Sequence, residues 1–281
     1  MKASPLENYS SLHEWSLIEL LRWNIPWLRK PFFVQFNFNL HTPLKVRPET
    51  YITFHTRNDD DLSPDAPNCS FSISNITRWG LDIYQYQSLD DFLNRTIRWH
   101  RCNYKKSKKK FLDYGCETTF IEGDWSEYAE QAFQLYLKVA QKFDYWLYDL
   151  NFFQEIAKRP DYKLLCAWFK GEMVAVFVLQ EELPTLHFLC CGLDYQHSTN
   201  SYAYTWMNYA LFEYAIPRKK YKHLDAGLSA DESKKAIGYQ PIPSRMDIYS
   251  KGLVHHVLRG ISRFFKASIT PNANVKLEWR R

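Results

Sequence analysis

Apolar and polar residues alternate with two different periods along residues 161–251, and this change of period predicts a series of short strands and helices. Two runs rich in β-branched and aromatic residues are joined by a short turn with Gly171, which is typical of a β-hairpin. The predicted elements are, in order, strands at 162–169, 173–179 and 185–192, a helix at 201–216, a strand at 223–227, a helical turn at 231–237 that ends at Gly238, and a strand at 244–249.

The residues before this stretch carry further periodic segments. From Val34 onward apolar and polar residues alternate, and Ser88 followed by Asp91 has the form of a helix N-cap that opens a helix of about twenty residues. The predicted elements are a helix at 12–28, strands at 34–40, 51–56 and 69–76, the helix that begins at 89, a strand at 117–122, a helix that follows a cap at 124–127, and a short helix at 151–158.

Composition narrows the class of protein. The 281 residues include 46% hydrophobic and 17% aromatic residues, which is enough for a hydrophobic core and is not typical of a disordered chain. The formal net charge of +5 is compatible with an anionic partner. Six cysteines show no CxxC spacing, so we expect reduced thiols and no metal. We find neither a secretory signal nor a stretch of about 20 apolar residues, and we therefore expect a cytoplasmic protein.

A strongly basic segment lies in the predicted helix that begins at 89. Its cations are Arg95, Arg98, Arg101, Lys105, Lys106, Lys108, Lys109 and Lys110. One interpretation is a surface for an anionic substrate, such as a phosphorylated lipid, a nucleotide-linked sugar or an RNA end. The other is a solvated helix face, and the sequence leaves both open.

Three short stretches between residues 225 and 241 resemble sequence motifs near the C-terminal end of the domain in a known protein family. They are Asp225-Ala226-Gly227, Asp231-Glu232-Ser233-Lys234 and Ile237-Gly238-Tyr239-Gln240-Pro241. Together they resemble the ending of FemAB-like acyltransferases of the GCN5-related N-acyltransferase (GNAT) superfamily, including predicted N-acyltransferases linked to peptidoglycan biosynthesis. The resemblance covers roughly residues 95–250 and includes the basic helix ahead of the core.

The resemblance implies a fold and a division of the chain. The expected fold is α/β, with a mixed, mostly antiparallel sheet, flanking helices and two splayed central strands, here 185–192 and 223–227. The predicted parts are an N-terminal helix and β-rich portion at 1–88, the acyltransferase domain at 89–250, and a basic amphipathic helix with a tail at 251–281.

The activity that the resemblance implies is the transfer of an acyl or aminoacyl group to an amine of a cell-envelope or small-metabolite acceptor. The implied donor is acyl-CoA or aminoacyl-tRNA, so tRNA is an expected partner. The alternative is a non-catalytic binding module of the same fold, which holds an anionic ligand on the basic helix.

Three residues are candidates for catalysis. Asp225 matches the family's aspartate and either orients the acceptor amine and takes its proton or anchors the loop at Gly227. His187 is a candidate base, although a single histidine in a strand is more often structural. Cys191 is a candidate acyl-carrying nucleophile, and no positioned base for it is visible in the sequence.

The candidate substrate-binding residues are cationic or hydroxylated. Lys234 matches the family's lysine, and we expect an exposed side chain that contacts a substrate phosphate or carboxylate. The segment 192–201 holds one glycine, which makes an ordinary CoA pyrophosphate loop doubtful. The remaining candidates are Ser198 and Ser201 at a predicted helix start, where they either bind phosphate or cap the helix, and Arg98, Arg101 and Lys105 on the basic helix.

Two stretches combine aromatic residues with cations, at 12–28 and 253–266. Such amphipathic helices suit the surface of an anionic bilayer, which predicts peripheral attachment to the inner face of the membrane. The alternative is that both helices pack on the protein or on a second subunit.

Overall fold

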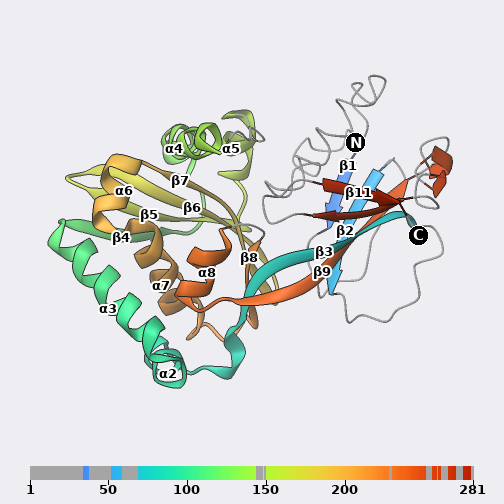
Figure 1. Cartoon of the computed structure of the whole chain (residues 1–281). Coiled ribbons are helices and arrows are strands. Elements are labelled where there is room, and N and C mark those ends of the chain that lie inside the picture. The colour runs from blue at the N-terminus through green and yellow to red at the C-terminus, as the bar shows by residue number, and fades with distance from the viewer. Residues whose placement is uncertain are drawn as a thin grey trace. The chain divides into compact units, whose positions relative to one another are not determined.

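The structure is a computed structural model that describes residues 34–37, 52–58, 69–143, 148, 150–227, 230–250, 255–257, 259–260, 265–269 and 275–279 (Figure 1). The predicted helix at 12–28 lies outside these residues. None of the helices within the described ranges has the length and apolar composition that a membrane crossing requires.

The chain forms two compact units. One consists of Trp79–Pro241, and the other combines Met1–Arg78 with Ile242–Arg281. Strands β3 (Cys69–Asp82) and β9 (Gln240–Ser250) each contain a boundary between the units. The sequence predicted boundaries near residues 88 and 250 instead. Both strands are longer than the segments predicted for them, 69–76 and 244–249.

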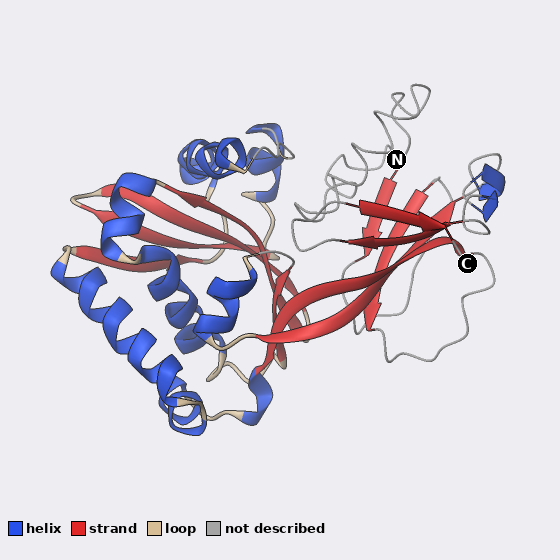
Figure 2. Cartoon of the chain, in the orientation of Figure 1, coloured by secondary structure: helices blue, strands red, loops and turns tan. Residues whose placement is uncertain are grey.

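The unit Trp79–Pro241 is built on a twisted sheet with helices on both faces (Figure 2). Its strand order is β3-β8-β7-β6-β5-β4. The strands are β8 (His223–Gly227), β7 (Thr185–Leu193), β6 (Glu172–Glu182), β5 (Tyr162–Phe169) and β4 (Cys116–Ile121). Neighbours pair antiparallel except β7 and β8, which pair parallel. The predicted hairpin at 162–179 and the predicted mixed, mostly antiparallel sheet are therefore confirmed.

The parallel pair β7–β8 opens into a fork. Its register joins Thr185 to His223, Leu186 to Leu224 and His187 to Asp225, where the ladder ends. Strand β7 continues to Leu193 without further pairing to β8. The expected splay of the central strands is therefore present, and the fork begins at His187.

Helices cover the two faces of this sheet. The helical elements are η3 (Ile83–Gln85), α2 (Leu89–Arg95), α3 (Arg98–Asp113), η4 (Ser126–Tyr128), α4 (Ala129–Lys142), α5 (Leu150–Ile156), α6 (Tyr195–Ser201), α7 (Ala203–Ala215) and α8 (Asp231–Ile237). Figure 1 shows α4 and α5 on one side of the sheet and α3, α7 and α8 on the other. On the α7 side, Phe177, Phe212 and Tyr239 belong to one buried hydrophobic cluster.

A glycine permits close packing on the α4 side. A Cβ atom at Gly192 would lie 2.5 Å from the backbone nitrogen of Tyr136 and 2.6 Å from Leu135. These contacts are too short for any side chain, so glycine lets the backbone of α4 lie directly against β7.

Two helix predictions need correction. The single long helix expected from Ser88 is divided into α2 and α3, because Thr96 has an extended backbone (φ −100, ψ 168). The Ser88 cap itself is confirmed, since its hydroxyl accepts a hydrogen bond from the Asp91 N–H at 3.1 Å. The helix predicted at 201–216 is preceded by α6, and Tyr202, with φ 59, separates α6 from α7.

The second unit is a smaller group of strands. In it β1 (Val34–Asn37) pairs parallel with β2 (Ile52–Asn58), and β2 pairs antiparallel with β9. Strand β10 (Phe265–Ile269) pairs antiparallel with β11 (Val275–Trp279) and parallel with β3. The prediction of an amphipathic helix at 253–266 is therefore wrong at its C-terminal end, because Phe265 and Lys266 belong to β10.

Candidate active site

A buried histidine–aspartate pair lies at the fork between β7 and β8. His187 Nδ1 is 3.0 Å from Asp225 Oδ2, and the side chains are 10% and 8% exposed. The second carboxylate oxygen of Asp225 accepts a hydrogen bond from the Gly227 N–H at 2.8 Å. The parallel register therefore joins two residues that the sequence identified separately as catalytic candidates.

The pair determines which imidazole nitrogen carries the proton. A carboxylate can only accept, so His187 Nδ1–H donates to Asp225 and the neutral ring keeps a lone pair on Nε2. His187 Nε2 is buried and has no hydrogen-bond partner among the described residues. Glu182 Oε2 lies 3.7 Å away on a side chain that is 46% exposed. This arrangement leaves a basic nitrogen beside a carboxylate.

Lys234 and Cys191 lie close to each other next to this fork. Only 3% of Lys234 is exposed, so the expectation of an exposed lysine is wrong. Burial raises the pKa of Cys191 to about 12, although the positive charge of Lys234 acts in the opposite direction. The Cys191 thiol is therefore protonated at neutral pH, which does not favour a nucleophilic role.

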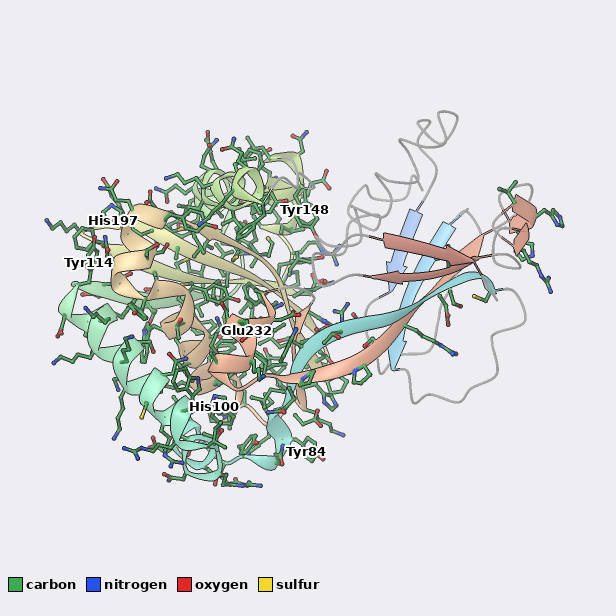
Figure 3. The ribbon with its side chains drawn as sticks, viewed as in Figure 1. Tyr84, His100, Tyr114, Tyr148, His197 and Glu232 are labelled. Carbon is green, nitrogen blue, oxygen red and sulfur yellow. The ribbon has the colours of Figure 1, made fainter. Side chains whose placement is uncertain are left out.

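Helix α8, which carries Lys234, is fixed by contacts at both ends. At its start, Trp79 Nε1–H donates to Asp231 Oδ1 at 2.7 Å. At its end, the Ala236 carbonyl accepts from His100 Nδ1 at 3.0 Å and from Asn103 Nδ2 at 2.9 Å. Figure 3 shows His100 on α3 and Glu232 on α8.

The bounds of α8 agree with the helical turn predicted at 231–237. Gly238 ends the helix with φ 118, as predicted. At the start, Ala230 occupies the N-cap position with φ 54 and makes no side-chain cap hydrogen bond. Nothing in the sequence pattern indicated Trp79, His100 or Asn103, because each contacts a residue more than a hundred positions away.

The turn between β7 and α6 is closed by an internal carboxylate. Asp194 caps α6 by accepting from the Gln196 N–H at 3.0 Å, and its other oxygen binds Lys138 Nζ at 2.5 Å. Burial raises the pKa of Asp194, but Lys138 and the backbone N–H groups outweigh burial and hold the pKa below its usual value. The carboxylate of Asp194 therefore supplies the negative charge that the positive N-terminal end of α6 attracts.

The two serines predicted near this turn are buried within α6. Ser198 is 5% exposed, and Ser201 is fully buried with its hydroxyl donating to the His197 carbonyl at 2.9 Å. They were expected at a helix start, but the Asp194 cap places the start of α6 before them. The burial of both side chains does not favour the predicted contact with a phosphate.

The cations predicted to bind substrate, Arg98, Arg101 and Lys105, lie on α3, which packs on α6, α7 and α8. Arg101 donates to the Thr96 carbonyl at 2.5 Å and to the Leu93 carbonyl at 3.3 Å, so it closes the end of α2. Arg98 and Lys105 are exposed. The fork and the basic helix are thus separate features of the unit, linked through α8.

The sheet order, the parallel β7–β8 pair and its splay define an α/β fold of the GNAT type in its FemAB-like form. FemX is similar in structure, with a TM-score of 0.52 at 11% identity over 75% of this chain and 74% of that chain. L-PGS from Bacillus licheniformis has a TM-score of 0.51 at 10% identity, over 76% of this chain and 72% of that chain. No protein-family model matches the sequence, and no curated protein is significantly similar to it.

Proposed function

We propose that this protein is an N-acyltransferase that moves an acyl or aminoacyl group onto an amine. The observation that carries the proposal is the buried His187–Asp225 pair at the last paired position of β7 and β8, where the fork begins. Its fold is shared with FemX and L-PGS, and this likeness supports the reaction class.

In the proposed reaction, His187 acts as a general base. An acceptor arriving as an ammonium ion is attracted by the carboxylates of Glu182 and Asp225 and gives a proton to His187 Nε2. The amine lone pair then forms a bond to the acyl carbon while the bond to the leaving group breaks, and the nitrogen releases its second surplus proton to solvent through the half-exposed Glu182 carboxylate. The leaving group departs with that electron pair and takes the proton back from the imidazolium, which Asp225 stabilises in the interval.

The fork supplies donors for the developing oxyanion. Beyond His187, the edge of β7 that faced β8 receives no ladder bonds from that strand. Backbone N–H groups along this edge are fixed by the sheet, so they can polarise an acyl carbonyl without reorganising. The buried cation of Lys234 adds a positive potential next to β7, as its effect on the pKa of Cys191 indicates.

The turn between β7 and α6 favours aminoacyl-tRNA over acyl-CoA as the donor. Acetyl-CoA enzymes of this fold bind the pyrophosphate at this turn. Here the Asp194 carboxylate occupies the N–H groups of α6 and is itself paired with Lys138. A pyrophosphate would have to displace a carboxylate that is already charge-paired, which is unfavourable by both repulsion and lost hydrogen bonds.

The test combines a donor panel with mass spectrometry. The full chain is incubated with a mixture of aminoacyl-tRNAs or of acyl-CoAs, together with small amines and peptidoglycan precursors, and amide products are detected by mass. We expect an amide product with aminoacyl-tRNA and little with acyl-CoA. An anionic ligand that is bound but never turned over would overturn the proposal in favour of a binding module.

A further inference from the structure

Helix α3 has one face that packs on the protein and another that is strongly basic. His100, Ser107 and Phe111 are buried against the rest of the unit. The opposite face carries Arg98, Lys105 and Lys109, all of them exposed. At a rise of 1.5 Å per residue, these three cations span about 16 Å along one side of the helix.

The cations of this face are not neutralised. Among the described residues, Arg98, Lys105, Lys109 and Lys110 make no ion pair or hydrogen bond with a carboxylate. The side chains of Lys106 and Lys108 lie over aromatic rings, 5.0 Å from Tyr202 and 5.6 Å from Tyr104 respectively. Like charges this close repel each other, so the face is stabilised when it meets negative charge.

Large apolar side chains flank the basic face. Trp99 is 63% exposed on one flank, and Leu112 is 56% exposed on the other flank near the opposite end of the helix. Ile97, directly before the helix, is 64% exposed. Exposed tryptophan and aliphatic side chains beside lysines suit the boundary between lipid headgroups and acyl chains.

We propose that the outer face of α3 docks on an anionic phospholipid surface. The cations would bind headgroup phosphates while Trp99 and Leu112 enter the interfacial layer. A nucleic acid would also satisfy the cations, but it offers nothing for exposed Leu112 and Ile97, whereas a bilayer surface accommodates both. Figure 1 shows α3 running along the outside of its unit, where a flat surface can reach it.

This inference goes beyond the proposed reaction and is tested without any substrate. The full chain is sedimented with phosphatidylcholine vesicles that contain or lack phosphatidylserine. We expect binding to the anionic vesicles only. Each cation near an anionic surface contributes roughly 1 kcal/mol, so the double variant Lys105→Gln/Lys109→Gln should bind about thirtyfold more weakly.

The matched control removes the same charge elsewhere in the unit. Lys158 and Lys222 are exposed and lie outside α3, so Lys158→Gln/Lys222→Gln should retain nearly all vesicle binding. Trp99→Ala should weaken binding most clearly at high salt, where the electrostatic contribution is screened. Thermal melting establishes that every variant is folded.

Three results would overturn the proposal. They are no binding of the wild-type chain to anionic vesicles, an equal loss in the control variant, and tight binding of single-stranded RNA through Lys105 and Lys109 with no vesicle binding. The last result would assign the face to nucleic acid. An inactive enzyme that still binds vesicles would contradict the proposed function alone.

Discussion

At the scale of single residues, the identity of residue 225 decides which nitrogen of His187 is protonated. Asp225 accepts from His187 Nδ1 and from the Gly227 N–H. In Asp225→Asn, an amide N–H directed at Nδ1 would move the imidazole proton to Nε2 and remove the base. We expect turnover to fall by about a hundredfold or more, in the range of general-base catalysis, with a smaller change in substrate binding.

A second His–Asp pair provides the control for this variant. His223, which lies on β8 like Asp225, has its Nδ1 2.5 Å from Oδ1 of Asp82 on the neighbouring strand β3. Asp82→Asn should therefore leave turnover nearly unchanged. Full activity in Asp225→Asn, together with a lower melting temperature, would show that Asp225 only anchors the turn at Gly227.

Burial of Lys234 makes its aliphatic chain part of the packing. Lys234→Ala should lower the free energy of unfolding by about 2 kcal/mol, since it leaves a cavity comparable to that of a large-to-small core substitution. Lys234→Met keeps most of the volume and removes the charge, so it should recover most of the melting temperature. It should still lose turnover if the charge assists the reaction. Equal stability of wild type and Lys234→Ala would contradict this account.

The sequence identified His187, Asp225 and Lys234 individually but not their arrangement. The pairing of His187 with Asp225 depends on the register of two strands nearly forty residues apart, which no local pattern encodes. The burial of Lys234 depends on which face of a short helix turns inward. A seven-residue helix has too few turns for periodicity to decide that.

At the scale of elements, the contact between α4 and β7 depends on the absence of a side chain at position 192. Gly192→Ala would place a Cβ atom 2.5 Å from the Tyr136 backbone nitrogen. Relieving this clash requires a shift of the α4 backbone, which costs free energy. We expect the free energy of unfolding to fall by about 3 kcal/mol, as for overpacked cores. Urea denaturation measures this change.

Gly260→Ala is the matched control for this substitution. A Cβ atom at Gly260 would meet open space, and no unusual φ angle restricts it. Its free energy of unfolding should differ little from wild type. A similar loss in both variants would mean that the effect comes from glycine replacement in general and not from the approach of α4 to β7.

Most strands and helices of Trp79–Pro241 could be predicted, because their apolar periods are long and their turns carry glycine. The division between α2 and α3 could not, since Arg98 to Asp113 and Leu89 to Arg95 share one continuous helical period. The break at Thr96 is stabilised by Arg101, which binds the carbonyls of Leu93 and Thr96. Such a tertiary contact leaves no local signature.

At the scale of the whole molecule, acid should weaken the unit Trp79–Pro241 partly through Glu181. Burial raises the pKa of Glu181, but hydrogen bonds from Lys220 and Tyr221 outweigh burial and leave the pKa below its usual value of 4.5. A carboxyl with a lowered pKa in the folded state stabilises the fold above its unfolded pKa. That stabilisation is lost as the pH falls through the folded pKa.

Glu181→Gln should therefore reduce the free energy of unfolding by about 2 kcal/mol at neutral pH, the cost of hydrogen bonds to a charged group. The difference from wild type should shrink as the pH falls below 4.5. Thermal melts across a pH series measure it, with the exposed Glu117→Gln as control. A difference that is constant with pH would exclude the charge of Glu181 as the cause.

The fold type of the unit Trp79–Pro241 was accessible from the sequence through its element order and the ending at 225–241. Strands β3 and β9 extend past the predicted strand ends, so the boundaries fall inside strands rather than in loops. Loop composition, the usual sequence signal for a boundary, is absent at such positions.

The most direct test of the central claim is the rate of amide formation in His187→Gln, compared with wild type and with His223→Gln, under the donor conditions that give product. We predict a loss of at least about a hundredfold in His187→Gln and nearly full activity in His223→Gln, with all three proteins folded. Amide formation at the wild-type rate in His187→Gln would contradict the assignment of the fork as the site of acyl transfer.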